Sequence, residues 1–143
     1  MLPVTSRPTT PTGSGVLPVE QYVATLARKR VAAGVLFRDA RGRVLLAEPS
    51  YKPNWEMPGG ALEADEVPWA AAVRELAEEL GWSGPLGRLL VVDYVRPQDG
   101  RPEGVVFVFD GGMLDEVELA AMVFPDGEIR SARSRRSARP VTR

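Results

Sequence analysis

Short apolar runs rich in β-branched residues recur through the middle of the chain, and runs of this length and composition are typical of strands. They cover residues 31–37, 43–47, 88–95 and 105–109. The first two flank residues 39–42, where Asp39 and Gly42 supply turn chemistry, so this pair is predicted to be a β-hairpin. The second pair is joined through the Pro and Gly of residues 97–100. We therefore expect four substantial strands.

One segment, residues 68–80, is predicted to be a helix. Pro68 suits a first helical position and Gly81 suits the position just past a helix end. At about 100° per residue the large apolar side chains form one stripe, which is expected to pack on the sheet. The stripe contains Trp69, Val73, Leu76 and Leu80. Glu75, Glu78 and Glu79 fall on roughly the opposite face, which is expected to meet solvent.

Strands around one helix predict an α/β (α+β) fold in a single domain, for which 143 residues suffice. Residues 48–60 contain three prolines and end in Pro58-Gly59-Gly60, which predicts a loop around a short central strand and a close backbone approach to a ligand. Residues 1–30 are expected to be a flexible arm and 31–130 the folded domain. Within the arm, residues 19–26 are compatible with a short helix or an extended segment.

The sequence contains no cysteine and no histidine. This excludes thiolate nucleophiles, histidine general bases and the usual structural zinc sites, so any metal must be held by oxygen. The net charge of −1 is unevenly distributed, because residues 31–127 carry eight basic and seventeen acidic side chains, a net −9. Such a core repels a polyanion, so a nucleic acid polymer is not an expected ligand.

The sequence lacks two features that would direct a protein to a membrane or out of the cell. No window of the sequence approaches the roughly 18 consecutive apolar residues of a membrane span. The segment of residues 1–15, MLPVTSRPTTPTGSG, lacks the apolar stretch of a secretory signal. A cytoplasmic protein without membrane contact is therefore expected.

Glu75, Glu78 and Glu79 stand at positions i, i+3 and i+4 of the predicted helix. Like charges at this spacing cost a few tenths of a kcal/mol per pair in an isolated helix. A divalent cation offsets the repulsion, because Mg²⁺ and Mn²⁺ prefer carboxylate, carbonyl and water oxygens. The alternative is a merely solubilising acidic face, which is the commoner reading for an arbitrary acidic helix.

The residues around this helix follow a longer pattern. Gly60 is followed by five residues, Glu66, seven residues and then Arg74-Glu75-Leu76-Ala77-Glu78-Glu79-Leu80-Gly81-Trp82. The segment resembles the Nudix box of the Nudix hydrolase family at every position, and Pro58-Gly59-Gly60 precedes it as in many members. The resemblance covers residues 31 to 109 and implies a Nudix-like mixed β-sheet sandwiched by helices, with a single catalytic helix.

The resemblance also implies chemistry. In the family, metal binding and general-base work fall on the positions of Glu75, Glu78 and Glu79, with the Gly60 carbonyl as an extra ligand and Glu66 acting through water or a second metal. Arg74 matches an arginine that pairs with a box glutamate and orients it. The implied reaction is attack of water, activated by Mg²⁺ or Mn²⁺, on phosphorus in a nucleoside diphosphate linked to another moiety. The general base stays open, with Glu79 or Glu75 favoured.

Residues outside the box are expected to select this small-molecule nucleotide. The candidates for stacking or phosphate contact are Tyr51, Lys52, Trp55, Tyr94 and Arg96. For each aromatic residue, core packing is the competing interpretation. Pro97 lies fifteen residues beyond Trp82, a spacing similar to that of ADP-ribose-cleaving relatives. ADP-ribose is therefore one specific candidate.

The end of the sequence departs from the family. Family members usually continue with a strand and a C-terminal helix, whereas residues 128–130 start like a strand and an Arg/Ser-rich run follows. Residues 131–143 are expected to be disordered and the C-terminal helix to be missing or replaced. Apolar sheet surface would then be exposed, which a homodimer would cover. Acidic residues in this half are candidates for one more metal ligand: Glu103, Glu116, Glu118 and, favoured among them, Glu128.

Two other functions remain alternatives. One is a Nudix-fold regulatory module that binds a nucleotide without cleaving it, for which family members usually show a degraded box. The other is a truncated, inactive Nudix domain whose Arg/Ser-rich segment replaces the proper C-terminus. The intact box favours the hydrolase over both.

Overall fold

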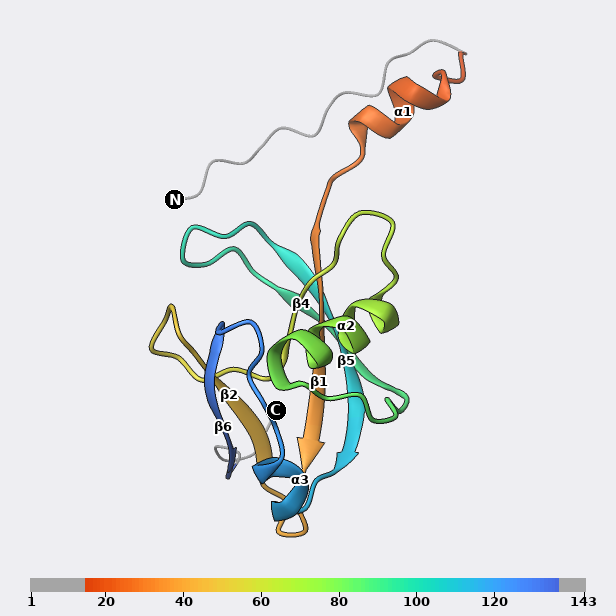
Figure 1. Ribbon diagram of the computed structural model, residues 1–143. Helices are drawn as coiled ribbons and strands as arrows, with labels where there is room; N and C mark the ends of the chain where they lie inside the picture. The colour runs from red at the N-terminus through yellow and green to blue at the C-terminus, as the bar shows by residue number, and fades with distance from the viewer. Residues whose placement is uncertain (1–14, 137–143) are drawn as a thin grey trace.

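The computed structural model describes residues 15–136 and contains one six-stranded mixed sheet (Figure 1). The strands run in the order β4-β5-β1-β2-β6, with β3 paired to β1 off this path. The helices are α1 (Val19–Thr25), α2 (Pro68–Leu80) and α3 (Glu116–Ala120). The strands are β1 (Arg30–Arg38), β2 (Val44–Pro49), β3 (Gly59–Ala61), β4 (Leu89–Val95), β5 (Gly104–Met113) and β6 (Ile129–Arg135). The predicted mixed α/β (α+β) class is confirmed.

The central strand β1 carries the predicted hairpin. It runs antiparallel to β2, with Arg38 opposite Val44. Between them the Asp39 carboxylate accepts the N–H groups of Arg41 at 3.0 Å and Arg43 at 2.8 Å, while Gly42 turns the chain at φ +73°. On its other side β1 pairs with β5 in parallel. The Asp and Gly of the turn thus act as the sequence predicts.

The second predicted strand pair is also confirmed. β4 and β5 are antiparallel, with Tyr94 opposite Val105 and Val95 opposite Gly104. The turn between them places Asp99 and Gly100 at positive φ. The central loop of the chain contains the expected short strand, β3, whose Gly60 lies opposite Ala33 of β1.

Helix α2 begins and ends as predicted, with Pro68 in its first turn and Gly81 in the left-handed conformation at φ +62°. The prediction of its buried face was only half right. Leu76 and Leu80 are buried, but Trp69 is 51% exposed and Val73 is 38% exposed. Their places are taken by Ala71, Ala72 and Glu79. Because alanine side chains are small, they allow the helix to lie close to the sheet. The buried stripe is therefore rotated from the predicted one toward Ala71 and Ala72.

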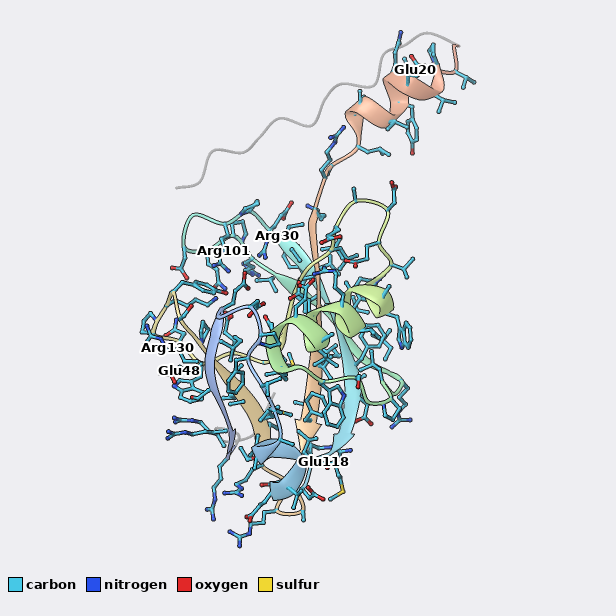
Figure 2. The ribbon with its side chains drawn as sticks, in the orientation of Figure 1. Glu20, Arg30, Glu48, Arg101, Glu118 and Arg130 are labelled. Atoms are coloured by element: carbon cyan, nitrogen blue, oxygen red, sulfur yellow. The ribbon has the colours of Figure 1, made fainter. Side chains whose placement is uncertain are left out.

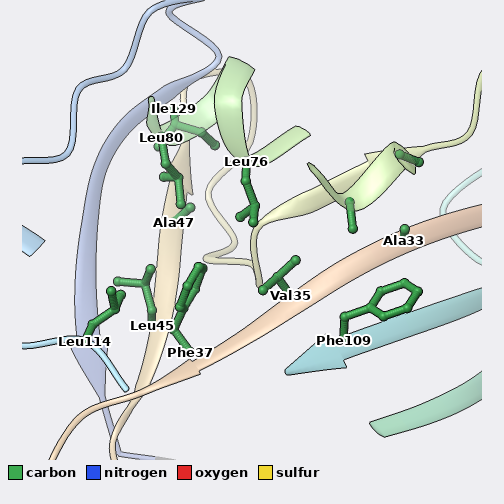
Figure 3. Packing of buried hydrophobic residues seen from close by; sticks show 12 residues of the cluster. Ala33, Val35, Phe37, Leu45, Ala47, Leu76, Leu80, Phe109, Leu114 and Ile129 are labelled. Atoms are coloured by element: carbon green, nitrogen blue, oxygen red, sulfur yellow. The ribbon is translucent and has the colours of Figure 1, made fainter. Parts of the chain in front are cut away.

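The core lies between α2 and one face of the sheet (Figure 3). It combines side chains of β1, β2, β5 and α2 with Leu114 and Ile129. Phe37 of β1 meets Trp82 edge to face, with ring centroids 5.3 Å apart. This packing fixes α2 over β1 and β3, and therefore fixes where the helix presents its glutamates.

Strand β6 corrects the prediction of disorder from residue 131. Residues 129–135 pair with β2 in antiparallel register, so the prediction was wrong for 131–135. Backbone hydrogen bonds to β2 hold the strand, and Ile129 is buried in the core. The guanidinium groups of Arg133 and Arg135 lie 5.9 and 4.4 Å from the centroid of the Trp55 ring. Residues 137–143, including any C-terminal helix, lie outside the described residues.

The remaining helices are short. α3 begins with a capping box, in which Asp115 and Glu118 each accept the other's backbone N–H. For residues 19–26, which the sequence left open, the structure shows the helix α1, none of whose residues is buried. Among residues 15–136, every helix is too short or too polar to cross a bilayer.

Candidate metal-binding and catalytic site

Two adjacent glycines bring the backbone of β3 against helix α2. At Gly59 the backbone has φ +147°, and a Cβ there would overlap the carbonyl of Ala33. A Cβ on Gly60 would overlap the carboxylate of Glu75. A side chain at Gly59 would push β3 away from β1, and a side chain at Gly60 would displace the Glu75 carboxylate.

Glu79 is the most deeply placed acidic group among the described residues and is only 6% exposed. Its carboxylate accepts the Gly59 N–H at 3.1 Å. Burial raises its pKa to about 8, and although the Gly59 N–H works against this shift, Glu75, Asp126 and Glu128 add to it. The side chain thus has a proton affinity suited to general-base work near neutral pH.

Glu75 lies beside Glu79 and is also withdrawn from water. Burial raises its pKa, the neighbouring Arg74 lowers it, and the charges of Glu78 and Glu128 raise it again. The arrangement corrects the prediction that these glutamates meet solvent. Glu75 and Glu79 face the glycine pair, and of the three only Glu78 is largely exposed. A desolvated pair of carboxylates is costly without a cation.

Arg74 gathers the other acidic residues of the segment. Its Nε donates to Glu66 Oε2 and its Nη2 to Glu66 Oε1, both at 2.8 Å. Its Nη1 donates to Glu75 at 2.9 Å and Glu78 at 3.1 Å, and Nη2 also reaches the carbonyl of Ala61. The paired guanidinium lowers the pKa of Glu66 to about 2. The expected pairing of Arg74 with a box glutamate is present, and it extends to three glutamates.

The chemistry of these donors fits a divalent cation, although they are not grouped around a ready-made cage. Within residues 15–136, no three acidic side chains converge as a metal cluster. Arg74 pairs with Glu66, Glu75 and Glu78, whereas Glu79 forms no ion pair among the described residues. All-oxygen donors and excess negative charge suit a hard dication. Asp126 joins Glu128 near this pair, and sequence reasoning missed Asp126, which the Asp-Gly turn before β6 signals.

A cleft of about 470 Å³ opens beside the glycine pair. It is lined by Gly59, Gly60 and Met57 together with Tyr51, Lys52, Glu56, Arg30 and Arg101. Of the expected substrate contacts, the structure brings Lys52 and Tyr51 to the cleft, with Lys52 paired to Glu56. Trp55 instead stacks on Arg133 and Arg135 of β6.

Tyr94 and Arg96 do not line the cleft either. The Tyr94 hydroxyl donates to Glu103, the residue just before strand β5. Arg96 follows the end of β4 and is exposed. Neither residue lies with the glutamates of α2 and the glycine pair, so their predicted substrate contacts have no support in this arrangement.

Sequence reasoning missed two cations of the cleft. Figure 2 shows Arg30 and Arg101 near one another, and both line the cleft. The Nε of Arg30 is buried without a hydrogen-bond partner. A buried unpaired donor is unfavourable unless a ligand or water satisfies it. The sequence shows Arg30 only as the end of an Arg28-Lys29-Arg30 run, whose simplest interpretation is a solvated boundary.

Comparisons with known proteins agree with this geometry. The family model of the NUDIX domain matches residues 28–138. The mouse diphosphoinositol polyphosphate phosphohydrolase 3-alpha is 46% identical over 82 residues, which cover 56% of this chain and 49% of that protein. The mouse diphosphoinositol polyphosphate phosphohydrolase 2 is 43% identical over 82 residues, covering 56% of this chain and 45% of that protein. The chain thus matches about half the length of these curated relatives.

Solved structures show the same fold. A MutT protein from Methanosarcina mazei is 22% identical, with a TM-score of 0.64 over 78% of this chain and 80% of the other. The NUDIX domain of NrtR from Shewanella oneidensis, complexed with ADP ribose, is 18% identical, with a TM-score of 0.62 over 82% of each chain. The chain belongs to the NUDIX domain family, so the family resemblance expected from the sequence is confirmed. Members of this family generally use divalent metal ions and act on small molecules.

The raised pKa of Glu79 predicts an unusual pH dependence of stability. In the metal-free protein the folded state holds a proton on Glu79 up to about pH 8, whereas the unfolded carboxyl releases it near 4.5. The unfolding free energy should therefore fall as pH rises between these values, by on the order of 1 to 3 kcal/mol. Urea unfolding in the presence of a chelator at pH 5, 7 and 8.5 measures this slope. The Glu79→Gln variant should flatten it, and an equally steep slope in that variant would contradict the assignment.

Proposed function

We propose that this protein is a metal-dependent hydrolase that cleaves a phosphoanhydride bond by attack of water on phosphorus. The observation that carries the proposal is the desolvated pair of Glu75 and Glu79, held against the backbone of Gly59 and Gly60 at the edge of a cleft. A bound Mg²⁺ or Mn²⁺ would lower the pKa of the attacking water and neutralise phosphate charge. The family, whose box residues this pair matches, supports this role.

In this proposal the residues of the chain have distinct roles. Glu75, Glu79 and the Gly60 carbonyl are the oxygen donors, with Glu78 available at the exposed side of the helix. The Gly59 N–H holds the Glu79 carboxylate in place at 3.1 Å. Arg74, bonded to Glu75, Glu78 and Glu66, keeps the acidic side chains in position rather than contacting substrate.

The proton of the attacking water must go to a carboxylate, because the sequence has no histidine or cysteine. Glu79 is the favoured acceptor because burial raises its pKa to about 8. A base with a pKa near the working pH combines a useful deprotonated fraction with enough proton affinity. Burial and the nearby charge of Glu75 raise the proton affinity of Glu79. A bound cation would increase the deprotonated fraction of this carboxyl group.

The cleft favours a substrate with several phosphate groups. Arg30, Lys52 and Arg101 line the cleft that begins at Gly59 and Gly60, so phosphates on both sides of the scissile bond would meet opposite charge. The partnerless Nε of Arg30 offers a donor for one of them. The relatives named diphosphoinositol polyphosphate phosphohydrolases support this substrate class, and we propose it as the first candidate.

A nucleoside diphosphate derivative is the second candidate, and Tyr51 is the observation that favours it. Tyr51 lines the cleft and is 62% exposed, so its ring offers a stacking surface for a base. ADP-ribose belongs to this class. Such a substrate carries fewer phosphates than the three cations of the cleft can pair, which places it second.

The Glu79→Gln variant tests the catalytic proposal. Amide replacement removes the proton acceptor and a metal donor at nearly constant shape, so kcat/KM should fall about 10²- to 10⁴-fold. The assay measures the phosphorylated products released from a diphosphorylated inositol polyphosphate, ADP-ribose and nucleoside triphosphates with Mg²⁺ or Mn²⁺. The matched control is Glu116→Gln on α3, because the structure places this candidate ligand outside the cleft and away from Glu75 and Glu79, and the variant should keep full activity. Binding without turnover by the wild type would instead support the regulatory module.

The two arginines of the cleft test the substrate class. Replacing Arg30 or Arg101 by glutamine should lower kcat/KM for the inositol substrate about tenfold or more, and less for ADP-ribose. The loss should shrink at high salt because the contacts are charged. Arg88→Gln, an exposed arginine away from the cleft, is the control. Equal losses on both substrates would argue against selection by these side chains.

A further inference from the structure

A second compartment adjoins the cleft beside the glycine pair. It has a volume of about 330 Å³ and is lined by Lys52, Asn54, Glu56, Gln98, Asp99 and Arg101. Lys52, Glu56 and Arg101 line both spaces, so the cleft and the compartment meet at these three side chains. Sites for small molecules usually have volumes of about 300–1,000 Å³. The compartment is therefore large enough to hold one part of a substrate whose other part lies in the cleft.

One wall of the compartment is the turn between β4 and β5. Asp99 and Gly100 have φ values of +50° and +74°, and a two-residue hairpin turn of this kind needs positive φ at both positions. Gln98 and Arg101, on either side of them, exchange backbone hydrogen bonds of 3.2 and 2.8 Å. Residues paired in this way project their side chains from the same face of the hairpin. The turn thus places the amide of Gln98 beside the guanidinium group of Arg101.

The other wall is the loop between β2 and β3. Glu56 is anchored by two backbone hydrogen bonds to Ala47, at 2.7 and 2.9 Å. The Glu56 carboxylate also pairs with Lys52, so the chain on both sides of Asn54 is held at the compartment. Figure 1 shows this loop, in yellow, and the teal tip of the β4–β5 hairpin at the same side of the molecule.

The two spaces differ in charge. The cleft is lined by three cationic side chains and one acidic, a net charge of +2, whereas the compartment is lined by two of each and is neutral. Phosphate groups are therefore attracted to the cleft, while in the compartment they would meet the carboxylates of Glu56 and Asp99. Among the described residues, no aromatic or large apolar side chain lines the compartment, so it offers no stacking surface for a base.

The polar groups of the compartment suit hydroxyl groups. The amides of Asn54 and Gln98 each provide donors and an acceptor, and the Asp99 carboxylate provides acceptors. Within residues 15–136 these three side chains form no hydrogen bond, so their capacity is available to a ligand. A ring with several hydroxyl groups both donates and accepts, and can replace the water in such a space without loss of hydrogen bonds.

We propose that the compartment binds the hydroxyl-bearing end of the substrate, a sugar or cyclitol ring that keeps free hydroxyl groups away from the scissile bond. The inference rests on the proposed function, because it takes the diphosphate to lie in the cleft. It narrows the substrate class within both candidates. A ring phosphorylated at every position would bring phosphate against Glu56 and Asp99, whereas a partly phosphorylated ring or the terminal ribose of ADP-ribose would not.

Ligands that share one diphosphate and differ in the attached group test this proposal. The probes are methyl diphosphate, myo-inositol with one diphosphate and otherwise free hydroxyl groups, and the same ring phosphorylated at every other position. Calorimetry in the presence of a chelator measures their dissociation constants without turnover. The hydroxyl-bearing ring should bind about tenfold or more tightly than methyl diphosphate, and Gln98→Ala or Asn54→Ala should each weaken it about threefold or more. Gln21→Ala on the exposed helix α1 is the matched control and should change neither ligand.

The Asp99→Asn variant should act with opposite sign on the two rings. Asparagine tolerates positive φ, so the turn should be kept. Loss of the carboxylate should weaken the hydroxyl-bearing ring, but it should tighten the fully phosphorylated ring about threefold, because the compartment gains net positive charge. Asp65→Asn is the matched control, because Asp65 is an exposed aspartate at φ +61° that lines neither space.

Three results would overturn the proposal. They are equal affinity for methyl diphosphate and the hydroxyl-bearing ring, a change of the same sign for both rings in Asp99→Asn, and no binding of the hydroxyl-bearing ring at about 1 mM. The proposed function is tested separately by turnover with metal. A protein that distinguishes these ligands in the chelator but hydrolyses none of them with Mg²⁺ or Mn²⁺ would contradict the hydrolase and support the compartment.

Discussion

The site depends on one physical constraint, the placement of two carboxylates where water is scarce. Glu75 and Glu79 lie between helix α2 and the glycine pair of β3, and their raised pKa values follow from that burial. Evolution rarely keeps a buried acidic pair without a use, because an apolar residue in the same place would cost less. In the proposed function a divalent cation would remove this cost and would allow a strongly negative domain to accept a phosphorylated substrate.

The surrounding structure serves this placement. The Phe37–Trp82 contact and the buried alanines of α2 hold the helix close to the sheet, while Gly59 and Gly60 allow the backbone of β3 to approach it. Arg74 balances the remaining charge by binding Glu66, Glu75 and Glu78 at once. Core packing, backbone conformation and charge pairing therefore determine the same geometry.

Much of the fold and of the site could be predicted from the sequence, because single residue types at turns and helix ends determine these elements. Asp39 and Gly42 specify the first hairpin, Pro68 and Gly81 bound the helix, and the spacing of its glutamates indicates a cation. The orientation of the helix could not be predicted in the same way. The burial of Ala71 and Ala72 depends on tertiary packing against the sheet, which no local pattern in the sequence indicates. The stripe predicted from the large apolar residues of α2 is therefore rotated around the helix relative to the face that is buried in the structure.

The other errors also concern tertiary contacts. Strand β6 has the composition of a disordered segment, yet pairing with β2 and the stacking of its arginines on Trp55 hold it in the sheet. The cations of the cleft come from residues 30, 52 and 101, and the parallel pairing of β1 with β5 places Arg30 opposite Gly104, near Arg101. No local pattern links positions so far apart.

Calorimetric titration of the metal-free protein with Mn²⁺, repeated at pH 7 in buffers of different ionisation enthalpy, tests the central claim most directly. It measures binding and the number of protons released together. If the Glu75–Glu79 pair holds the cation, binding should release most of one proton at pH 7, because Glu79 has a pKa of about 8, and the release should vanish in Glu79→Gln. Absence of binding, or the same proton release in Glu79→Gln as in the wild type, would contradict the account.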